Sequence, residues 1–195
     1  MPPQLILVSG FAGSGKSSLA DSLGKKLGMK VVHASAMLRE MATKGVKALE
    51  NASPEKIEHW WETDEGKEFM KKRLKDPTLD KALDEKLMDI ARRGELVMDS
   101  WTMPYLYKGT DDVFRIWLKA TPQERAKRVS GRDKMDYENV LAKILSRDED
   151  TKALYKRLYN FEMGSNLGKF SLVINTGKIG ENEVFSKVIG KIRGD

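Results

Sequence analysis

The fold of this chain is decided by the stretch Gly10-Phe11-Ala12-Gly13-Ser14-Gly15-Lys16-Ser17. A buried-strand candidate, residues 5–8, precedes it, and Leu19, Leu23 and Leu27 recur every fourth residue after it, as on one face of a helix. Glycines between a strand and a helix let successive backbone amides turn inward around phosphate oxygens. The stretch therefore predicts a phosphate-binding loop of the Gly-x-x-x-x-Gly-Lys-Ser type, the P-loop.

Two side chains of this loop are expected to contact the phosphates and the metal ion of a nucleotide. Lys16 would reach the β- and γ-phosphates of a nucleotide, which makes it a candidate catalytic residue, and Ser17 would offer its hydroxyl to a magnesium ion. A guanine-specific protein should carry an Asn-Lys-x-Asp segment, but the nearest stretch, residues 175–178, lacks the acid. We predict a phosphate-binding set that comprises Gly10, Phe11, Ala12, Gly13, Ser14, Gly15, Lys16, Ser17 and Ser18.

Short apolar runs alternate with helical patterns along the rest of the chain. The runs predict strands at residues 5–8, 31–32, 96–98, 113–118 and 172–174. Helix starts are indicated by a capping residue before proline, and helix ends by glycine, at Ser53-Pro54, Asp76-Pro77, Thr121-Pro122 (with Glu124 completing a capping box), Gly28 and Gly94. This alternation predicts an α/β protein with the three-layer P-loop NTPase fold, in which helices cover both faces of a five-stranded parallel sheet.

Two strand-free stretches interrupt this rhythm. Residues 35–75 and residues 131–157 have helical patterns and no strand candidate, so we expect two insertions over the ends of the sheet. The chain shows no internal repeat or long linker. We therefore predict a single domain, 1–195, whose core comprises residues 1–34, 76–130 and 158–195.

Composition limits the class of protein. The 195 residues are 40% hydrophobic, which excludes global disorder, and 35 Lys and Arg against 29 Asp and Glu leave a net charge of +6. No apolar run approaches the ~20 residues of a membrane span, and residues 5–8 follow no basic segment of a signal peptide. Cysteine is absent, as in proteins of a reducing compartment. We expect a cytoplasmic protein, with a monomer favoured and no membrane partner.

The basic run at residues 71–75 could suggest a nucleic-acid partner. It lacks interleaved aromatic residues and any recognised reading module, so we expect a solvated helix end there instead.

Four arginines in the second half of the chain could stabilise a phosphoryl group. Arg125, Arg128 and Arg132 are spaced by three and four residues, which places them on one side of a helix, and Arg147 follows in the next helical stretch. Guanidinium groups stabilise the charge of a transferred phosphoryl group, and a hinged cover that carries them excludes water. The alternative for each is a solvated helix face paired with neighbouring acids.

Other polar side chains are expected near the carboxyl ends of the strands, where open α/β sheets bind ligands. Ser35 is predicted to cap a helix that projects Arg39 over this edge, where Arg39 could clamp an acceptor phosphate. Asp99 follows the strand at 96–98 and could bind the acceptor or position magnesium through water, or it could cap a turn. His33 and His59 show no pattern for metal binding or acid–base chemistry, and we expect them to be solvated or to cap helices.

With these residues the chain resembles the nucleoside monophosphate kinases, and in particular the short cytidylate kinases of archaeal type. Besides the P-loop, the resemblance is carried by residues 37–42, 80–84, 124–129, 147–149, 155–159 and 173–176. It implies that residues 35–75 bind the acceptor monophosphate, with Arg39 on its phosphate. It also implies a lid at 131–157, where Arg128, Arg132 and Arg147 act as catalytic residues, and a donor-adenine loop made by Asn175, Thr176 and Gly177.

The resemblance implies an ATP-dependent phosphotransferase that moves the γ-phosphoryl group of Mg²⁺-ATP to CMP or dCMP, with AMP as the second choice. The chain departs from the family pattern in two places. Trp101, in Asp99-Ser100-Trp101, replaces an arginine usual after the third strand, and Leu154 stands where an arginine usually precedes a tyrosine. An adenylate kinase, or a kinase for another small acceptor, is therefore an alternative. A non-catalytic regulatory nucleotide-binding protein, with RNA as its partner, is another.

Overall fold

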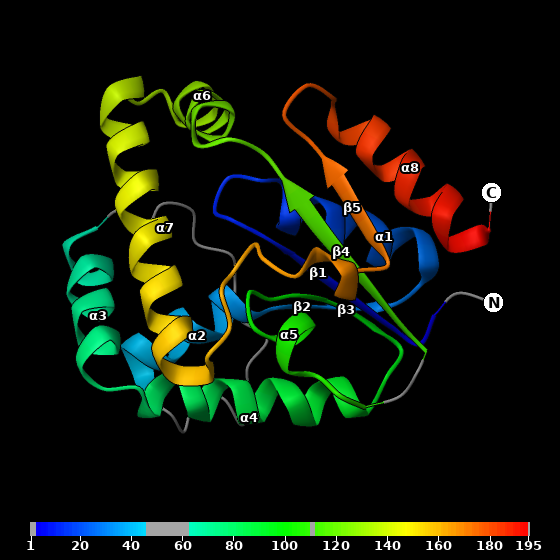
Figure 1. The fold of residues 1–195 in the computed structure, drawn as a ribbon, viewed down its shortest axis with the longest axis horizontal. Helices are drawn as coiled ribbons and strands as arrows, with labels where there is room; N and C mark the ends of the chain where they lie inside the picture. The colour runs from blue at the N-terminus through cyan, green and yellow to red at the C-terminus, as the bar shows by residue number, and fades with distance from the viewer. Residues whose placement is uncertain (1–2, 46–62, 110–111, 195) are drawn as a thin grey trace.

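A computed structural model describes residues 3–45, 63–109 and 112–194 of the chain. Its centre is a five-stranded sheet in which every pairing is parallel, as Figure 1 shows. The strands follow the spatial order β2-β3-β1-β4-β5. Their bounds are β1 Leu5–Gly10, β2 Lys30–His33, β3 Leu96–Asp99, β4 Val113–Lys119 and β5 Leu172–Asn175. All five predicted strands and the parallel sheet are confirmed.

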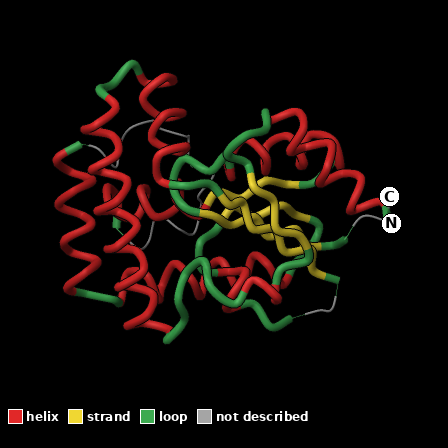
Figure 2. Tube along the Cα trace, turned by 45° about the horizontal axis from the view of Figure 1, so that its top comes forward, coloured by secondary structure: helices red, strands yellow, loops and turns green. Residues whose placement is uncertain are grey.

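Helices cover both faces of the sheet, and a further group stands beyond one end of it (Figure 2). One face is covered by α1 (Lys16–Leu27) and α8 (Glu181–Arg193). The other face is covered by α2 (Ala34–Lys44), α4 (Thr78–Arg92) and the short α5 (Met103–Leu106). The remaining helices are α3 (Asp64–Lys75), α6 (Pro122–Asp133), α7 (Tyr137–Tyr159) and a 3₁₀ turn, η3 (Leu167–Lys169).

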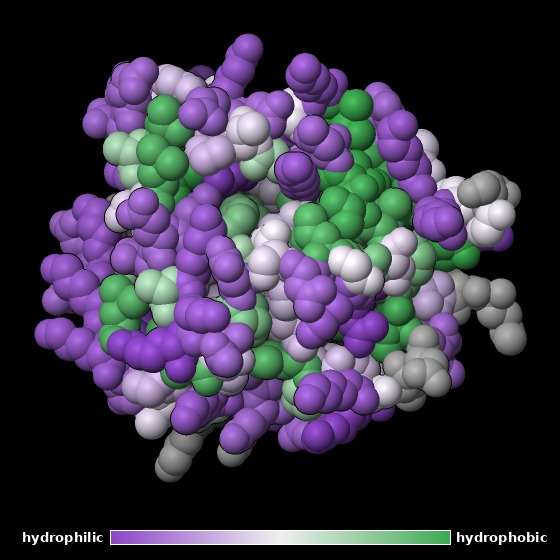
Figure 3. Space-filling model, in the orientation of Figure 1, coloured by the Kyte–Doolittle hydropathy of each residue, from purple (hydrophilic) through white to green (hydrophobic). Residues whose placement is uncertain are grey.

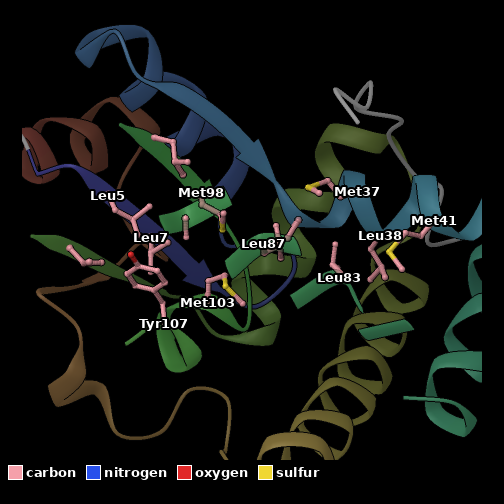
Figure 4. Packing of buried hydrophobic residues seen from close by; sticks show 14 of the residues in the cluster. Leu5, Leu7, Met37, Leu38, Met41, Leu83, Leu87, Met98, Met103 and Tyr107 are labelled. Carbon is pink, nitrogen blue, oxygen red and sulfur yellow. The ribbon is translucent and has the colours of Figure 1, made fainter. Parts of the chain in front are cut away.

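The alternation of side chains along β1 explains the layers. Leu5 and Leu7 point into a cluster with α2, α4 and α5, whereas Ile6 and Val8 point to α1 and α8. Figure 4 shows the first cluster running from the sheet to the contact between Leu83 and α2. A strand that is buried on both faces needs a continuous apolar run, and residues 5–8 provide one.

The predicted start of α6 is confirmed, since Thr121 and Glu124 form its capping box. Helix α4 begins at Thr78, one residue later than predicted, with Pro77 at the N-cap, and the Asp76 carboxylate accepts from the backbone N–H of Thr78 at 3.0 Å. Gly28 ends α1 at φ 68°, a left-handed conformation that glycine adopts without strain. The Ser35 cap is wrong: α2 begins at Ala34 immediately after β2, so Ser35 lies inside the first turn. The Ser53-Pro54 cap, with His59, lies outside the described residues.

In the stretches expected to be insertions, the structure describes α2 and α3 within residues 35–75, and the end of α6 with α7 within residues 131–157. The predicted lid limits, 131 and 157, both fall inside helices, because α6 ends at Asp133 and α7 runs without a break to Tyr159. The face over α3 and α7 is mostly hydrophilic, whereas apolar atoms gather over β5 and α8 (Figure 3). In the described part of the chain, no helix combines the length and the hydropathy needed to cross a membrane.

Candidate active site

The glycine loop lies between β1 and α1, at the carboxyl edge of the sheet. Gly13 and Gly15 have φ of 78° and 93°, which favours glycine at both positions. A Cβ at Gly13 would also approach Val129 to 3.1 Å, because α6 packs closely against the loop. No described side chain caps the start of α1, so its first amides stay available to an anion.

Lys16, the first residue of α1, reaches back over the loop. Its Nζ donates to the carbonyl of Phe11 at 3.1 Å and lies 5.7 Å from the centre of the Trp101 ring. Burial lowers the pKa of Lys16, an effect that Asp99 opposes and Arg147 reinforces. A buried ammonium group near other cations gains strongly from an anionic ligand, as the predicted phosphate contact requires.

Asp99 is the last residue of β3, and its carboxylate is hydrogen-bonded to side chains of α1 and β2. The Ser17 hydroxyl donates to its carboxylate at 2.7 Å, and Nδ1 of His33 lies 3.3 Å from the same oxygen. Burial alone would raise the pKa of Asp99, but the hydrogen bond from His33 and the charge of Lys16 lower it. Asp99 is therefore a buried, ionised carboxylate beside the phosphate loop.

His33 has a different place from the one expected. Its Nε2 lies 2.9 Å from the Asp21 carboxylate, so the imidazole bridges Asp21 on α1 and Asp99 on β3. The hydrogen bond with Asp99 is the main cause that raises the pKa of His33. The expectation of a solvated or capping side chain is wrong, because parallel pairing sets His33 level with Asp99 on the adjacent strand.

The oxygen atoms of Ser17 and Asp99 suit a magnesium ion. Mg²⁺ prefers hard oxygen ligands and usually combines one or two protein groups with phosphates and water. Among the described residues there is no group of three or more His, Cys, Asp or Glu side chains that could hold a metal ion. Both predicted metal residues thus fit the ion in their chemistry.

The arginines predicted to lie on one side of a helix have different partners in the structure. Arg125 is 1% exposed, pairs with Asp148 of α7 at 2.5 Å and donates to the carbonyl of Ala12 at 3.0 Å. Arg128 donates instead to the hydroxyl and carbonyl of Thr176. Arg125 therefore ties the phosphate loop to α7, and Arg128 holds the loop that follows β5.

The other two arginines face a shared cavity. Arg132 pairs with Asp133 at 2.5 Å, and the Arg147 guanidinium lies 5.3 Å from the centre of the Trp101 ring. The cavity has a volume of about 670 Å³, within the usual range for small-molecule sites. It brings together nine predicted residues: Ala12, Gly13, Lys16, Ser17, Ser35, Arg39, Asp99, Arg132 and Arg147.

Some predicted residues lie outside this cavity. Ser18, Arg128 and the loop of Asn175, Thr176 and Gly177 are absent from its lining. Thr176 is nevertheless linked to the phosphate loop, because its hydroxyl lies 3.3 Å from the carbonyl of Ser14.

The profile of the Cytidylate kinase-like family matches residues 5–178. The chain belongs to this family. A cytidylate kinase from Ignicoccus hospitalis is 33% identical over 185 residues, which cover 94% of this chain and 96% of that protein. A cytidylate kinase from Pyrococcus horikoshii is 29% identical, with 94% and 85% covered.

Solved structures support the fold of this cytidylate kinase-like chain. A shikimate kinase from Bacteroides thetaiotaomicron superposes with a TM-score of 0.58 at 12% identity, covering 98% of both chains. A gluconokinase from Sinorhizobium meliloti gives 0.53 at 14% identity, covering 98% of this chain and 93% of that one. Both are kinases by their names, and at this identity they establish the α/β P-loop architecture.

The basic run at residues 71–75 was expected to be a solvated helix end, and the structure shows otherwise for its third residue. Arg73 is 1% exposed and donates two hydrogen bonds to Asp80 of α4, at 3.1 and 2.6 Å, and one to the Tyr155 hydroxyl of α7 at 3.3 Å. The run is therefore not wholly a solvated helix end, since its third residue joins three helices. Lys71 and Lys72 are exposed, as expected.

Sequence reasoning assigned no role to Asp84, which lines the cavity and is 6% exposed. The Thr102 hydroxyl donates to it at 2.5 Å and the Tyr159 hydroxyl at 2.6 Å. Burial raises the pKa of Asp84 to about 6. The available signal was its position beside the leucine stripe of α4, four residues after Asp80.

The raised pKa of Asp84 predicts a pH-dependent stability. The folded state binds this proton more tightly than the unfolded state, so its stabilising effect is fully present below the unfolded-state pKa of about 3.9 and is lost as the pH rises through about 6. Between pH 5 and pH 7.5, the wild type should lose about 1.4 kcal/mol of unfolding free energy relative to Asp84→Asn. Urea denaturation of both proteins at the two pH values measures this difference, and parallel curves would contradict the assignment.

Proposed function

We propose that the chain is a nucleoside monophosphate kinase that transfers the γ-phosphoryl group of Mg²⁺-ATP to CMP or dCMP, with AMP as a weaker acceptor. The observation that carries the proposal is the shared cavity, which joins Lys16 of the phosphate loop to Arg39 of α2 and has Arg132 and Arg147 on its wall. The names of the relatives support CMP as the acceptor. A cytoplasmic location belongs to the same proposal.

The reaction needs no nucleophile from the protein. An oxygen of the acceptor phosphate forms a bond to the γ-phosphorus, and the bond from that phosphorus to the β–γ bridging oxygen breaks, leaving ADP and a nucleoside diphosphate. The chain contributes alignment and positive charge, since Lys16, Arg132 and Arg147 border one space. Magnesium would neutralise phosphate charge, with the Ser17 hydroxyl and, through water, Asp99 to hold it.

A coupled assay that detects ADP tests this proposal directly. Mg²⁺-ATP would be supplied with CMP, dCMP, UMP, AMP and GMP in turn, and with no acceptor as the baseline. The highest kcat/KM is expected for CMP or dCMP. A maximum for AMP would make the chain an adenylate kinase, and a baseline rate with every acceptor would favour a non-catalytic nucleotide-binding protein.

Arg39 is proposed to bind the acceptor phosphate. It is 6% exposed, lies on α2 and lines the same cavity as Lys16 of the phosphate loop. Arg39→Ala should raise KM for the acceptor at least tenfold and change KM for ATP less than threefold, because a guanidinium–phosphate contact contributes about 1.5–3 kcal/mol. Steady-state kinetics with each substrate varied in turn measures both values.

Lys44→Ala is the matched control for Arg39. Lys44 lies on the same helix and pairs with Glu40 at 3.1 Å on the surface. Both of its KM values should stay near those of the wild type. Equal increases of the two KM values in Arg39→Ala would remove Arg39 from the acceptor site.

A further inference from the structure

Trp101 is placed directly against the phosphate loop. It follows β3 by two residues, and β3 pairs in parallel with β1, so the chain passes level with Gly10 at this point. The indole Nε1–H donates to the carbonyl of Gly10 at 2.9 Å. The ring is also fixed from α7, where Tyr155 makes an edge contact at 6.3 Å between ring centres. The indole therefore has a defined position between the loop and α7.

Two cations contact this indole. Nζ of Lys16 lies 5.7 Å from the centre of the ring, and the guanidinium carbon of Arg147 lies 5.3 Å from it. Both distances are within the range of cation–π attraction, for which tryptophan is the best aromatic partner. Lys16 comes from α1 and Arg147 from α7, so one side chain collects charges from two separate elements.

An aromatic partner differs chemically from a carboxylate here. A carboxylate would occupy the N–H donors of Lys16 and Arg147 and neutralise their charge, which would weaken any phosphate site. The face of an indole attracts a cation electrostatically, but it is not a strong hydrogen-bond acceptor and carries no negative charge. An indole therefore leaves both positive charges in place, and the mutual repulsion of the two cations is partly offset.

We propose that Trp101 is a positioning residue for phosphoryl transfer: its indole holds Lys16 and Arg147 beside each other at the terminal phosphate of the donor. The expected effect of Trp101 on kcat rests on the proposed function. A second expected effect, a preference for binding a triphosphate over a diphosphate, does not depend on it. That preference exists whether or not the protein has an acceptor.

Isothermal titration calorimetry tests whether Trp101 sets the preference for a triphosphate over a diphosphate. The wild type, Trp101→Phe and Trp101→Leu would be titrated with Mg²⁺-ADP and with the magnesium complex of the non-hydrolysable β,γ-imido analogue of ATP. Trp101→Leu should lower the preference for the triphosphate about fivefold, since it removes the ring. Trp101→Phe keeps a ring and should stay within about twofold of the wild type. Equal preference in all three proteins would overturn the proposal.

A control separates positioning from packing. Phe170 is a buried ring of the neighbouring aromatic cluster, 5.5 Å from Tyr105 and 5.6 Å from Trp117 between ring centres. Phe170→Leu should reduce the melting temperature through lost packing and keep the triphosphate preference. A loss of preference in this variant as large as in Trp101→Leu would assign the effect to packing.

A double-mutant cycle on kcat identifies the partner. If Trp101 acts through Arg147, Trp101→Leu combined with Arg147→Ala should lose about fivefold less activity than the product of the two single losses. Arg157 lies on the same helix but donates to the carbonyl of Leu74, so Trp101→Leu with Arg157→Ala should be multiplicative. Multiplicative losses in both pairs would contradict the role of Arg147.

Fluorinated tryptophan at position 101 keeps the shape of the side chain if Trp101→Leu fails to fold. Each fluorine weakens the negative ring face, so the triphosphate preference should fall stepwise from the unmodified to the mono-, di- and trifluorinated indole. A constant preference would refute the proposal. A stepwise fall in a protein that phosphorylates no monophosphate would support the role of Trp101 and contradict the proposed kinase function.

Discussion

Lys16→Ala is expected to lower kcat by about 10³-fold, with the fold intact. Lys16 is the cation of the phosphate loop that borders the cavity, so its loss removes charge stabilisation where the γ-phosphoryl group is transferred. Within the described residues, the amine makes one hydrogen bond, to the Phe11 carbonyl, and its charged form is disfavoured by burial. Removing it should therefore leave the melting temperature close to the wild-type value. The coupled assay and thermal denaturation followed by circular dichroism measure the two effects.

Lys26→Ala provides the comparison, because Lys26 is an exposed residue in the last turn of the same helix. Its kcat should match the wild type. Near-normal phosphate transfer in Lys16→Ala would refute the assignment of the active site, and a large fall in melting temperature would show that Lys16 stabilises the fold.

Arg73→Met is expected to destabilise the protein by about 3–5 kcal/mol. The substitution leaves the Asp80 carboxylate, which is 2% exposed, buried without its ion-pair partner. It also removes the link from α3 to Tyr155 of α7. For a chain of this size each kcal/mol corresponds to about 2–4 °C, so the melting temperature should fall by about 10 °C.

The cause of this loss can be tested with a second substitution. Arg73→Met combined with Asp80→Leu removes both charges, and replacing a buried ion pair by apolar side chains of similar size is often neutral or stabilising. The double variant should therefore regain much of the lost stability. Lys72→Met, at an exposed neighbour of Arg73, should change the melting temperature by little. A double variant less stable than Arg73→Met would contradict the explanation.

The sheet could be predicted because its signals are local. Residues 5–8 form an apolar run between turn residues, and the helix that starts at Pro122 carries its capping box in the same few residues. The Ser35 cap failed because β2 continues into α2 without the extra residue that a cap would occupy. Strand pairing, which no local signal encodes, set that boundary.

The candidate site was predicted only in part. Residues of the phosphate loop lie within eight positions of one another, so their spacing alone indicates that they act together. The arginines were different. Arg125 and Arg128 have helix neighbours like those of Arg132, yet Arg125 is buried against Asp148, which follows 23 residues later. A helical spacing places side chains on one face but does not say what that face meets.

The amino-acid sequence by itself determined the phosphate loop, the alternation of strands and helices, and the family. These depend on backbone conformation and on periodic burial, which a few neighbouring residues control. Only the tertiary structure decided which partners the charged side chains meet: Arg73 meets Asp80, His33 meets two carboxylates, and Lys16 and Arg147 meet Trp101. The physical reason is that Coulomb and cation–π energies depend on distance and desolvation, and packing sets both between elements far apart in the chain.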